Sequence, residues 1–189
     1  MSKVGCIECG VPILPATASS TGGFCMPCKT GRRQSIDQAK QCRTEQYDDP
    51  LDKFWRELVR RVHDTASGFS GLSDVEKQYF AVGVLIGDVY NGGFDQYFFN
   101  SSADYYRYSL TGLEDMGAAQ ACALVRRAKQ VLFGFRDVPS VTSRRRAFLL
   151  ETQSTSRDER LQALNDKFWE DPDGLPGRCL AFARKHGLV

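Results

Sequence analysis

From residue 49 onward, apolar residues recur at steps of three and four, which is the period of an α-helix. Asp49 followed by Pro50 is typical of a helix start. Ser73 and Glu76 form a capping-box pattern, which predicts a second helix ending near Tyr90. We expect five more helices, at about residues 101–116, 118–133, 139–150, 155–170 and 176–185. No alternating strand pattern of useful length occurs after residue 49, so the sequence predicts an all-α bundle of about seven helices.

Residues 91–100 separate the second predicted helix from the third. Asn91, Gly92 and Gly93 permit positive φ, so we expect them to end the helix in a structural turn. The six residues that start at Phe94 contain four aromatic rings, and most of these rings should be buried. Asn100 closes the segment and belongs to the same turn. The segment is therefore expected to anchor the interior of the domain.

Three polar residues, Asp95, Gln96 and Asn100, stand among these rings. Buried polar groups need hydrogen-bond partners. One interpretation is that the three residues cap helices and satisfy the backbone of the turn. The alternative is a small polar pocket at residues 91–100, which would be the active site if the protein were a small enzyme.

Four of the seven cysteines form two close pairs, Cys6 with Cys9 and Cys25 with Cys28. The spacing C-x2-C-x15-C-x2-C is typical of a zinc site with four thiolate ligands. Four sulfur ligands leave no open position on Zn2+, so the ion would be structural and not catalytic. The alternative is four unligated thiols in a floppy leader.

The sequence between the cysteine pairs predicts a short β-hairpin or loop that is attached to a zinc knuckle. This module has too little apolar surface to fold without the metal. Polar residues follow it and predict a linker, in which a short helix from Ser35 to about Cys42 is possible. We therefore divide the chain into a zinc-knuckle module at residues 1–31, a linker at 32–48 and a helical domain at 49–189.

The composition is ordinary for a globular protein, with 42% apolar and 25% charged residues. No run of 18 apolar residues and no apolar leader occurs, so we expect a cytoplasmic protein without membrane contact. The net charge of +2 lacks the basic excess of a nucleic-acid-binding domain. Its distribution is uneven, because residues 49–115 contain eleven acidic and six basic residues, whereas residues 116–189 contain eight and thirteen.

Residues 90–102 read Tyr-Asn-Gly-Gly-Phe-Asp-Gln-Tyr-Phe-Phe-Asn-Ser-Ser and resemble the signature of the bacterial DNA-mimic-protein-like domain family. The likeness extends over roughly residues 50–185. It implies an all-helical domain. A characterised type of member presents acidic side chains spaced like DNA phosphates, occupies a transcription regulator and keeps it off its operator, although most members have unknown function. The layout of knuckle and domain is more loosely similar to small bacterial immunity-type proteins.

Mimicry of DNA requires an excess of carboxylates on one face, because phosphate charge dominates the affinity of proteins for DNA. Residues 49–189 as a whole contain nineteen acidic and nineteen basic residues, so only the acidic part of this region has the required sign. The candidate residues for an acidic binding face are Asp88, Asp95, Asp104, Glu114 and Asp115. The alternative is that they are ordinary helix caps and surface charges.

Catalytic motifs are not evident, since neither His63 nor His186 has a nucleophile suggested by the sequence. We therefore expect a non-catalytic protein that binds another protein, either a DNA-binding regulator or the target of an immunity-type protein. The alternative is a nucleic-acid-binding protein that uses the zinc module and the basic C-terminal half. In that half, Arg144, Arg145 and Arg146 would form a docking patch for an acidic partner, or would simply be solvated.

Overall fold

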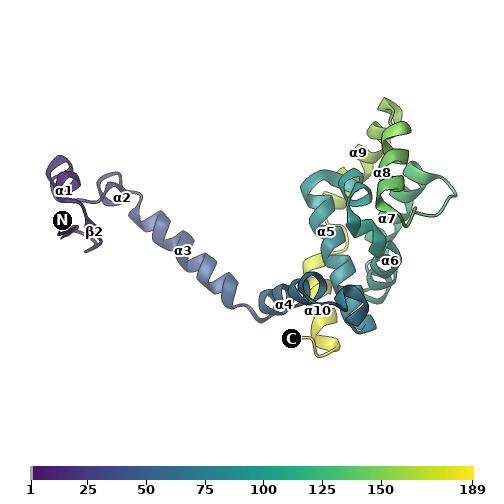
Figure 1. Ribbon diagram of the computed structural model, residues 1–189, viewed down its shortest axis with the longest axis horizontal. Helices are drawn as coiled ribbons and strands as arrows, with labels where there is room; N and C mark the ends of the chain where they lie inside the picture. The colour runs from purple at the N-terminus through teal and green to yellow at the C-terminus, as the bar shows by residue number, and fades with distance from the viewer. Residues whose placement is uncertain (1) are drawn as a thin grey trace. The chain divides into compact units, whose positions relative to one another are not determined.

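The computed structural model describes the backbone of residues 2–189 and the side chains of residues 2–41 and 49–189 (Figure 1). The chain divides into two compact units, Met1–Lys53 and Phe54–Val189, which we call the N-terminal unit and the helical unit. Helices dominate the chain and the strands are very short, which confirms the all-α class. In the described residues, no helix combines the length and the apolar character that crossing a membrane requires.

The N-terminal unit starts with a hairpin of two short antiparallel strands, in which Val4 pairs with Ile13. Its elements are β1 (Val4–Gly5), β2 (Pro12–Ile13), α1 (Pro15–Thr21), α2 (Met26–Lys29) and α3 (Arg33–Asp48). We expected a hairpin or loop between the cysteine pairs, and this was wrong for Pro15–Thr21, which form the helix α1. Pro15 fits the first helical position, and Gly22 ends the helix with a φ of 72°, which glycine adopts without strain.

Helix α3 covers nearly all of the segment that the sequence suggested as a linker. Our expected helix of residues 35–42 was too short, because α3 has 16 residues. Its sequence contains four glutamines, two arginines and one lysine, which favour helix without needing a buried face. An ion pair between Arg33 and Asp37, 3.6 Å apart at (i, i+4), supports its first turns.

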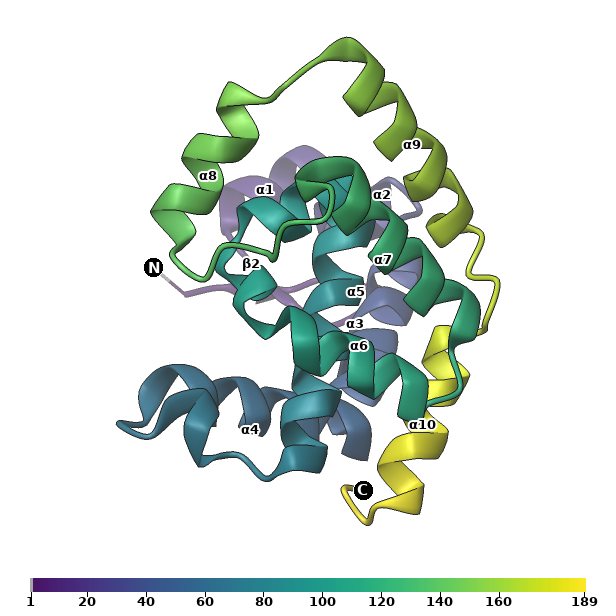
Figure 2. The ribbon, with the colours of Figure 1, turned by 90° about the vertical axis from the view of Figure 1, so that its right-hand side faces the viewer.

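The helical unit is arranged around α5, which packs against α6, α8 and α9 (Figure 2). Its elements, including two short 3₁₀-helices η1 and η2, are α4 (Pro50–Asp64), η1 (Gly68–Gly71), α5 (Asp74–Phe99), η2 (Ser101–Tyr105), α6 (Tyr106–Asp115), α7 (Ala119–Phe133), α8 (Thr142–Glu151), α9 (Thr155–Trp169) and α10 (Leu175–Lys185). The described chain after residue 49 thus contains seven α-helices, as the apolar pattern predicted.

Local capping signals place the starts of α4 and α5 where the sequence predicted them. The Leu51 amide donates to the Asp49 carboxylate at 2.7 Å. The Ser73 hydroxyl accepts from the Glu76 amide at 3.3 Å, and the Glu76 carboxylate accepts from the Ser73 amide at 2.9 Å. These contacts satisfy backbone amides that lack partners within the first helical turn.

The turn at Gly92 and Gly93 divides α5 into two helical segments that meet at a kink. Gly93 has a φ of 76° and a ψ of −175°, a conformation that is essentially restricted to glycine. The Phe94 amide, freed by this break, donates to the Asn165 side chain on α9 at 2.9 Å. Helical geometry then resumes as far as Phe99, so the first helix stops at Gly92 and Gly93, where the sequence placed the turn of Asn91, Gly92 and Gly93.

The aromatic residues after the break fill the centre of the helical unit. Phe94, Tyr97 and Phe98 are fully buried, which confirms that most of the four rings face the interior. The Phe98 ring lies 5.6 Å from the ring of Phe133 on α7. The Tyr97 hydroxyl shares a hydrogen bond of 3.1 Å with the hydroxyl of Ser109 on α6. This segment therefore joins α5 to α6 and α7.

We expect Gly93→Ala to destabilise the helical unit by about 2–4 kcal/mol and Gly92→Ala by less than about 1 kcal/mol. A Cβ on Gly93 would lie 2.4 Å from the Asn165 amide nitrogen and would force alanine into a positive φ. Gly92 has an extended φ of −163°, and its Cβ would meet the movable Gln96 side chain. Urea unfolding of both variants measures the difference. Equal effects would show that the Gly93–Asn165 contact is unimportant.

Candidate functional sites: a cysteine cluster and a polar cleft

The structure brings the four paired cysteines of the N-terminal unit together. The Sγ atoms of Cys6, Cys9, Cys25 and Cys28 all lie within 4.8 Å of one another, although the pairs are far apart in sequence. The Sγ atoms of Cys9 and Cys25 are 3.7 Å apart. A tetrahedral site with Zn–S bonds of about 2.3 Å places its sulfurs about 3.8 Å apart. The cluster therefore fits a metal ion with four thiolate ligands.

Backbone hydrogen bonds hold the cysteine loops in place. The Gly10 amide donates to the Cys6 carbonyl at 2.9 Å, which closes the first knuckle. The Cys25 amide donates to the Cys6 sulfur at 3.2 Å and links the second pair to the first. Arg33, at the start of α3, donates to the Cys9 sulfur at 2.7 Å. A guanidinium at this position offsets negative charge on the sulfurs.

The same contacts set the ionisation of the thiols. The Cys25 amide, followed by other backbone amides, lowers the pKa of the Cys6 thiol to about 6. The Arg33 guanidinium lowers the pKa of Cys9. Burial raises the pKa of Cys28. Because thiolates are the form that binds metals, a cation in the cluster would supply the charge that Cys28 needs to ionise.

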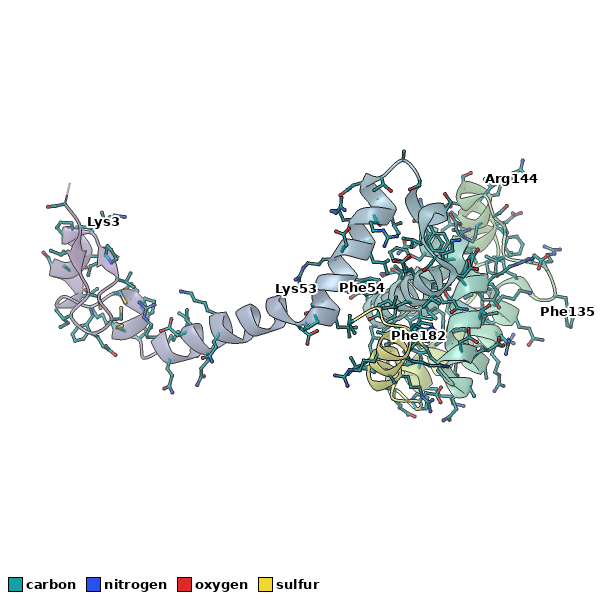
Figure 3. All side chains as sticks on the ribbon, turned by 90° about the horizontal axis from the view of Figure 1, so that it is seen from below. Lys3, Lys53, Phe54, Phe135, Arg144 and Phe182 are labelled. Carbon is teal, nitrogen blue, oxygen red and sulfur yellow. The ribbon has the colours of Figure 1, made fainter. Side chains whose placement is uncertain are left out.

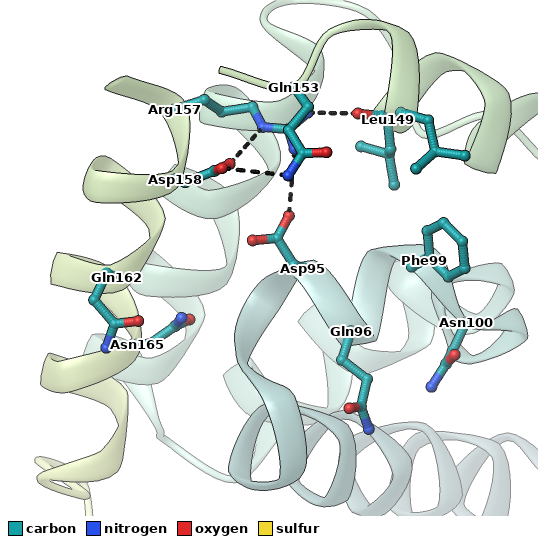
Figure 4. A pocket seen from close by; sticks show the side chains of 11 residues that line it. Asp95, Gln96, Phe99, Asn100, Leu149, Gln153, Arg157, Asp158, Gln162 and Asn165 are labelled. Carbon is teal, nitrogen blue, oxygen red and sulfur yellow. Dashed lines mark hydrogen bonds and ion pairs between the residues drawn. The ribbon is translucent and has the colours of Figure 1, made fainter. Parts of the chain in front are cut away.

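A second site is a cleft of about 780 Å³ between the C-terminal part of α5, α8 and α9 (Figure 4). Eleven side chains line it, and they include five amides and three charged groups. The lining residues are Asp95, Gln96, Phe99, Asn100, Leu149, Leu150, Gln153, Arg157, Asp158, Gln162 and Asn165. Polar residues 95, 96 and 100 thus line one pocket, as the second interpretation of the sequence proposed.

Arg157 joins the two carboxylates of this cleft (Figure 4). Its guanidinium lies 3.8 Å from the Asp95 carboxylate and 3.4 Å from the Asp158 carboxylate. It also donates to the Leu149 carbonyl at 2.7 Å, which ties α9 to α8. Burial raises the pKa of Asp95 above its usual value, and the charge of Arg157 opposes that rise. Two carboxylates and one arginine leave the cleft with a net negative charge.

Two of the predicted polar residues also stabilise the turn. The Asp88 carboxylate accepts from the Asn100 amide at 3.0 Å and from the Gln96 amide at 3.4 Å. These bonds connect the helix before the Gly93 break with the helix after it. The second oxygen of Asp88 is buried without a hydrogen-bond partner. Both sequence interpretations of this segment therefore describe part of the structure.

The three consecutive arginines of α8 do not form the docking patch, or the solvated triplet, that the sequence suggested. Arg145 is fully buried and donates to the carbonyls of Phe98 and Asn100 at 2.9 and 2.8 Å. Arg146 donates to the Phe99 carbonyl at 2.8 Å. These arginines donate to carbonyls at the C-terminal end of α5 that have no partner within the helix. Their positive charge also interacts favourably with the negative end of the helix dipole.

The five acidic candidate residues lie on three elements and have partners of their own. Asp104 pairs with Arg145 at 2.7 Å, and Glu114 pairs with Arg126. Asp115 accepts from Gln78 at 2.7 Å, while Asp88 and Asp95 have the partners described above. The structure brings Asp95 together with Asp158, which the sequence did not single out. The feature of the sequence that could have identified Asp158 is the series of polar residues Asp158, Gln162 and Asn165, which helical spacing places on one side of α9.

Both histidines lie outside the cleft. His63 is exposed near the end of α4, and the exposed His186 ring lies 4.4 Å from the Phe182 ring. The titratable groups that line the cleft are Asp95, Arg157 and Asp158, and Arg157 pairs with both carboxylates. Among the lining residues there is consequently no nucleophile beside a base.

A family model described as DMP19-like protein matches residues 70–186. The matched region contains α5 to α10 in full, and with them every residue that lines the cleft. The cysteine cluster lies outside it. No curated protein matches the chain. No solved structure matches it either.

Proposed function

The chain belongs to the DMP19-like protein family, and on this premise we propose that its helical unit binds another protein through the cleft between α5, α8 and α9. The binding is not catalytic. The partner is a DNA-binding regulator, whose surface for DNA is rich in lysine and arginine. An immunity-type role would use the same cleft against a different basic partner.

The observation that carries this proposal is the position of the signature segment. Asp95, Gln96, Phe99 and Asn100, all within residues 90–102, form the α5 wall of the cleft. Their neighbours Phe94, Tyr97 and Phe98 are buried and fix the position of this wall. Buried rings explain the stability of the segment. The partly exposed polar groups between them support a role in recognition.

The chemistry of the cleft favours a partner with basic and polar side chains. Asp95 and Asp158 accept hydrogen bonds from arginine or lysine, while the amides recognise backbone or polar groups. Leu150 on the rim is 63% exposed and offers an apolar contact. A desolvated apolar contact beside charged groups is a common arrangement in protein interfaces.

The charges favour a local contact over an extended copy of a DNA strand. Asp104 and Glu114 are neutralised by Arg145 and Arg126, so they contribute little negative field. The negative charge available to a partner is concentrated at Asp95 and Asp158, because these two carboxylates share the single arginine Arg157. We therefore propose that the protein imitates a short stretch of phosphates and not a whole operator.

Displacement from DNA tests this function. Proteins from a bacterial lysate are bound to duplex-DNA cellulose and challenged with the purified chain. We expect the wild-type chain to release a DNA-binding protein and the Asp95→Asn/Asp158→Asn variant to require at least about tenfold more protein for the same release. Asparagine keeps the shape of both side chains and removes their charge.

The matched control is Asp64→Asn/Glu170→Gln, which removes two exposed carboxylates outside the cleft. It should release the same protein as the wild-type chain, and thermal melting should show that all variants are folded. Release of no protein by the wild-type chain would contradict the proposed function. Equal release by both double variants would contradict the proposed surface.

We propose further that the cysteine cluster holds Zn2+ in a structural role. The tetrahedral spacing of its sulfurs and the presence of four thiol ligands support zinc, and four-coordination leaves no position for a substrate. The buried core of this small module consists of Ile13 and three of the cysteines, Cys6, Cys25 and Cys28. So small a core favours a metal as the main source of stability.

A further inference from the structure

The side of α9 that faces α7 differs from the side that lines the cleft. Here Arg160 and Lys167, seven residues apart on one face of α9, lie beside Arg127 of α7. The three side chains line a groove of about 320 Å³, together with Val131 and Ala163. Seven helical residues span about 10 Å, which separates the two cations of α9 along the helix axis.

In the part of the chain that the structure describes, no carboxylate lies within 4 Å of Arg127, Arg160 or Lys167, and all three are exposed. Their neighbours Arg126 and Arg157, by contrast, are paired with Glu114 and with Asp95. Three unpaired charges of one sign around a groove favour an anionic ligand.

A second groove continues this surface along α7. Gln130 lines both grooves, and the second also contains Tyr106, Lys129 and Phe135. Phe135 is 98% exposed, and its ring projects from the loop after α7 (Figure 3). Lys129 donates to the carbonyl of Gly134 at 3.2 Å, which anchors the start of this loop. An aromatic ring left entirely in water gains stability when a ligand covers it.

We propose that this surface binds single-stranded nucleic acid. The phosphates lie between Arg127, Arg160 and Lys167, and a base stacks on Phe135. Proteins that bind single strands combine a basic groove with an exposed aromatic platform, and both are adjacent here. A duplex keeps its bases stacked inside and would leave Phe135 unused, while an acidic protein would use the cations alone.

Fluorescence anisotropy with labelled 20-nucleotide oligo(dT) and oligo(U) tests the proposal, and a 20-base-pair duplex serves as the comparison. We expect the full-length chain to bind a single strand more tightly than the duplex. Arg160→Glu/Lys167→Glu should weaken binding at least tenfold and reduce the salt dependence by about 1.4 in the logarithmic slope. Phe135→Ala should weaken binding by about 5- to 100-fold at unchanged salt dependence.

The matched control is Arg144→Glu/Lys185→Glu, which makes the same change in net charge at exposed positions outside both grooves. It should bind like the wild-type chain, and so should Asp95→Asn/Asp158→Asn, which separates this proposal from the protein-binding cleft. The oligo(dT) and oligo(U) arms distinguish DNA from RNA. Absence of single-strand binding, stronger binding of the duplex, or equal losses in the control would overturn the proposal.

Discussion

Arg145→Met is expected to destabilise the helical unit by about 3–5 kcal/mol. Arg145 is fully buried and donates to the carbonyls of Phe98, Asn100 and Pro139 at 2.7–2.9 Å. It also forms an ion pair of 2.7 Å with Asp104. Methionine fills a similar volume but leaves these acceptors without a donor in the protein interior, and each unsatisfied group costs about 1–3 kcal/mol.

Urea unfolding of Arg145→Met, with Arg144→Met as the matched control, measures this effect. Arg144 is exposed on the same helix, so its replacement should change the unfolding free energy by less than about 0.5 kcal/mol. Arg145→Lys should also destabilise the unit, because an ammonium group cannot reach acceptors in several directions as a guanidinium does. Similar unfolding of the Arg144 and Arg145 variants would show that the buried arginine does not hold the end of α5.

Removal of the proposed metal is expected to unfold the cysteine module while the helical unit keeps its structure. Zinc-dependent modules derive about 10–16 kcal/mol from metal binding. The buried core here contains Ile13 and three of the proposed ligands, so apolar burial cannot replace the metal. The helical unit has its own interior around α5 and should not respond.

Amide NMR spectra of the full chain before and after chelation at pH 7 test this expectation, together with elemental analysis for one Zn2+ per chain. The dispersed signals of residues 4–31 should collapse, while those of residues 74–185 stay in place. Cys25→Ser should have the same effect without a chelator, whereas Cys179→Ser, at a half-buried cysteine in the helical unit, should keep the metal. Unchanged signals from residues 4–31 after complete metal loss would contradict a structural role.

The parts of the fold that the sequence predicted well are those set by local chemistry. Asp49 and Ser73 mark the starts of α4 and α5 because a cap acts within one turn. The prediction was wrong for α1 and too short for α3, because neither helix carries an apolar stripe. Gly93 was recognised as a turn residue, but the amide of Phe94 that the turn frees has its partner in Asn165, which lies 71 positions after Phe94.

The candidate sites likewise differ in whether neighbouring or distant residues in the sequence determine them. The cysteine cluster could be predicted because its spacing is encoded within each pair, and the structure brings the two pairs together. Asp95 was identified as a candidate, but its partner Arg157 and the second carboxylate, Asp158, reach it only through the packing of α9 against α5. Arg145 looked like surface charge because nothing local shows that it reaches the end of α5, 45 residues earlier.

Amide hydrogen exchange of the chain, with and without the protein that it releases from DNA, tests the central claim most directly. If the cleft between α5, α8 and α9 is the binding surface, the partner should slow exchange in residues 93–100 and 149–165. The α7 side of the unit should be unaffected. If the partner slowed amide exchange only in other helices, and the cleft residues exchanged as fast as in the chain without partner, the result would contradict the account.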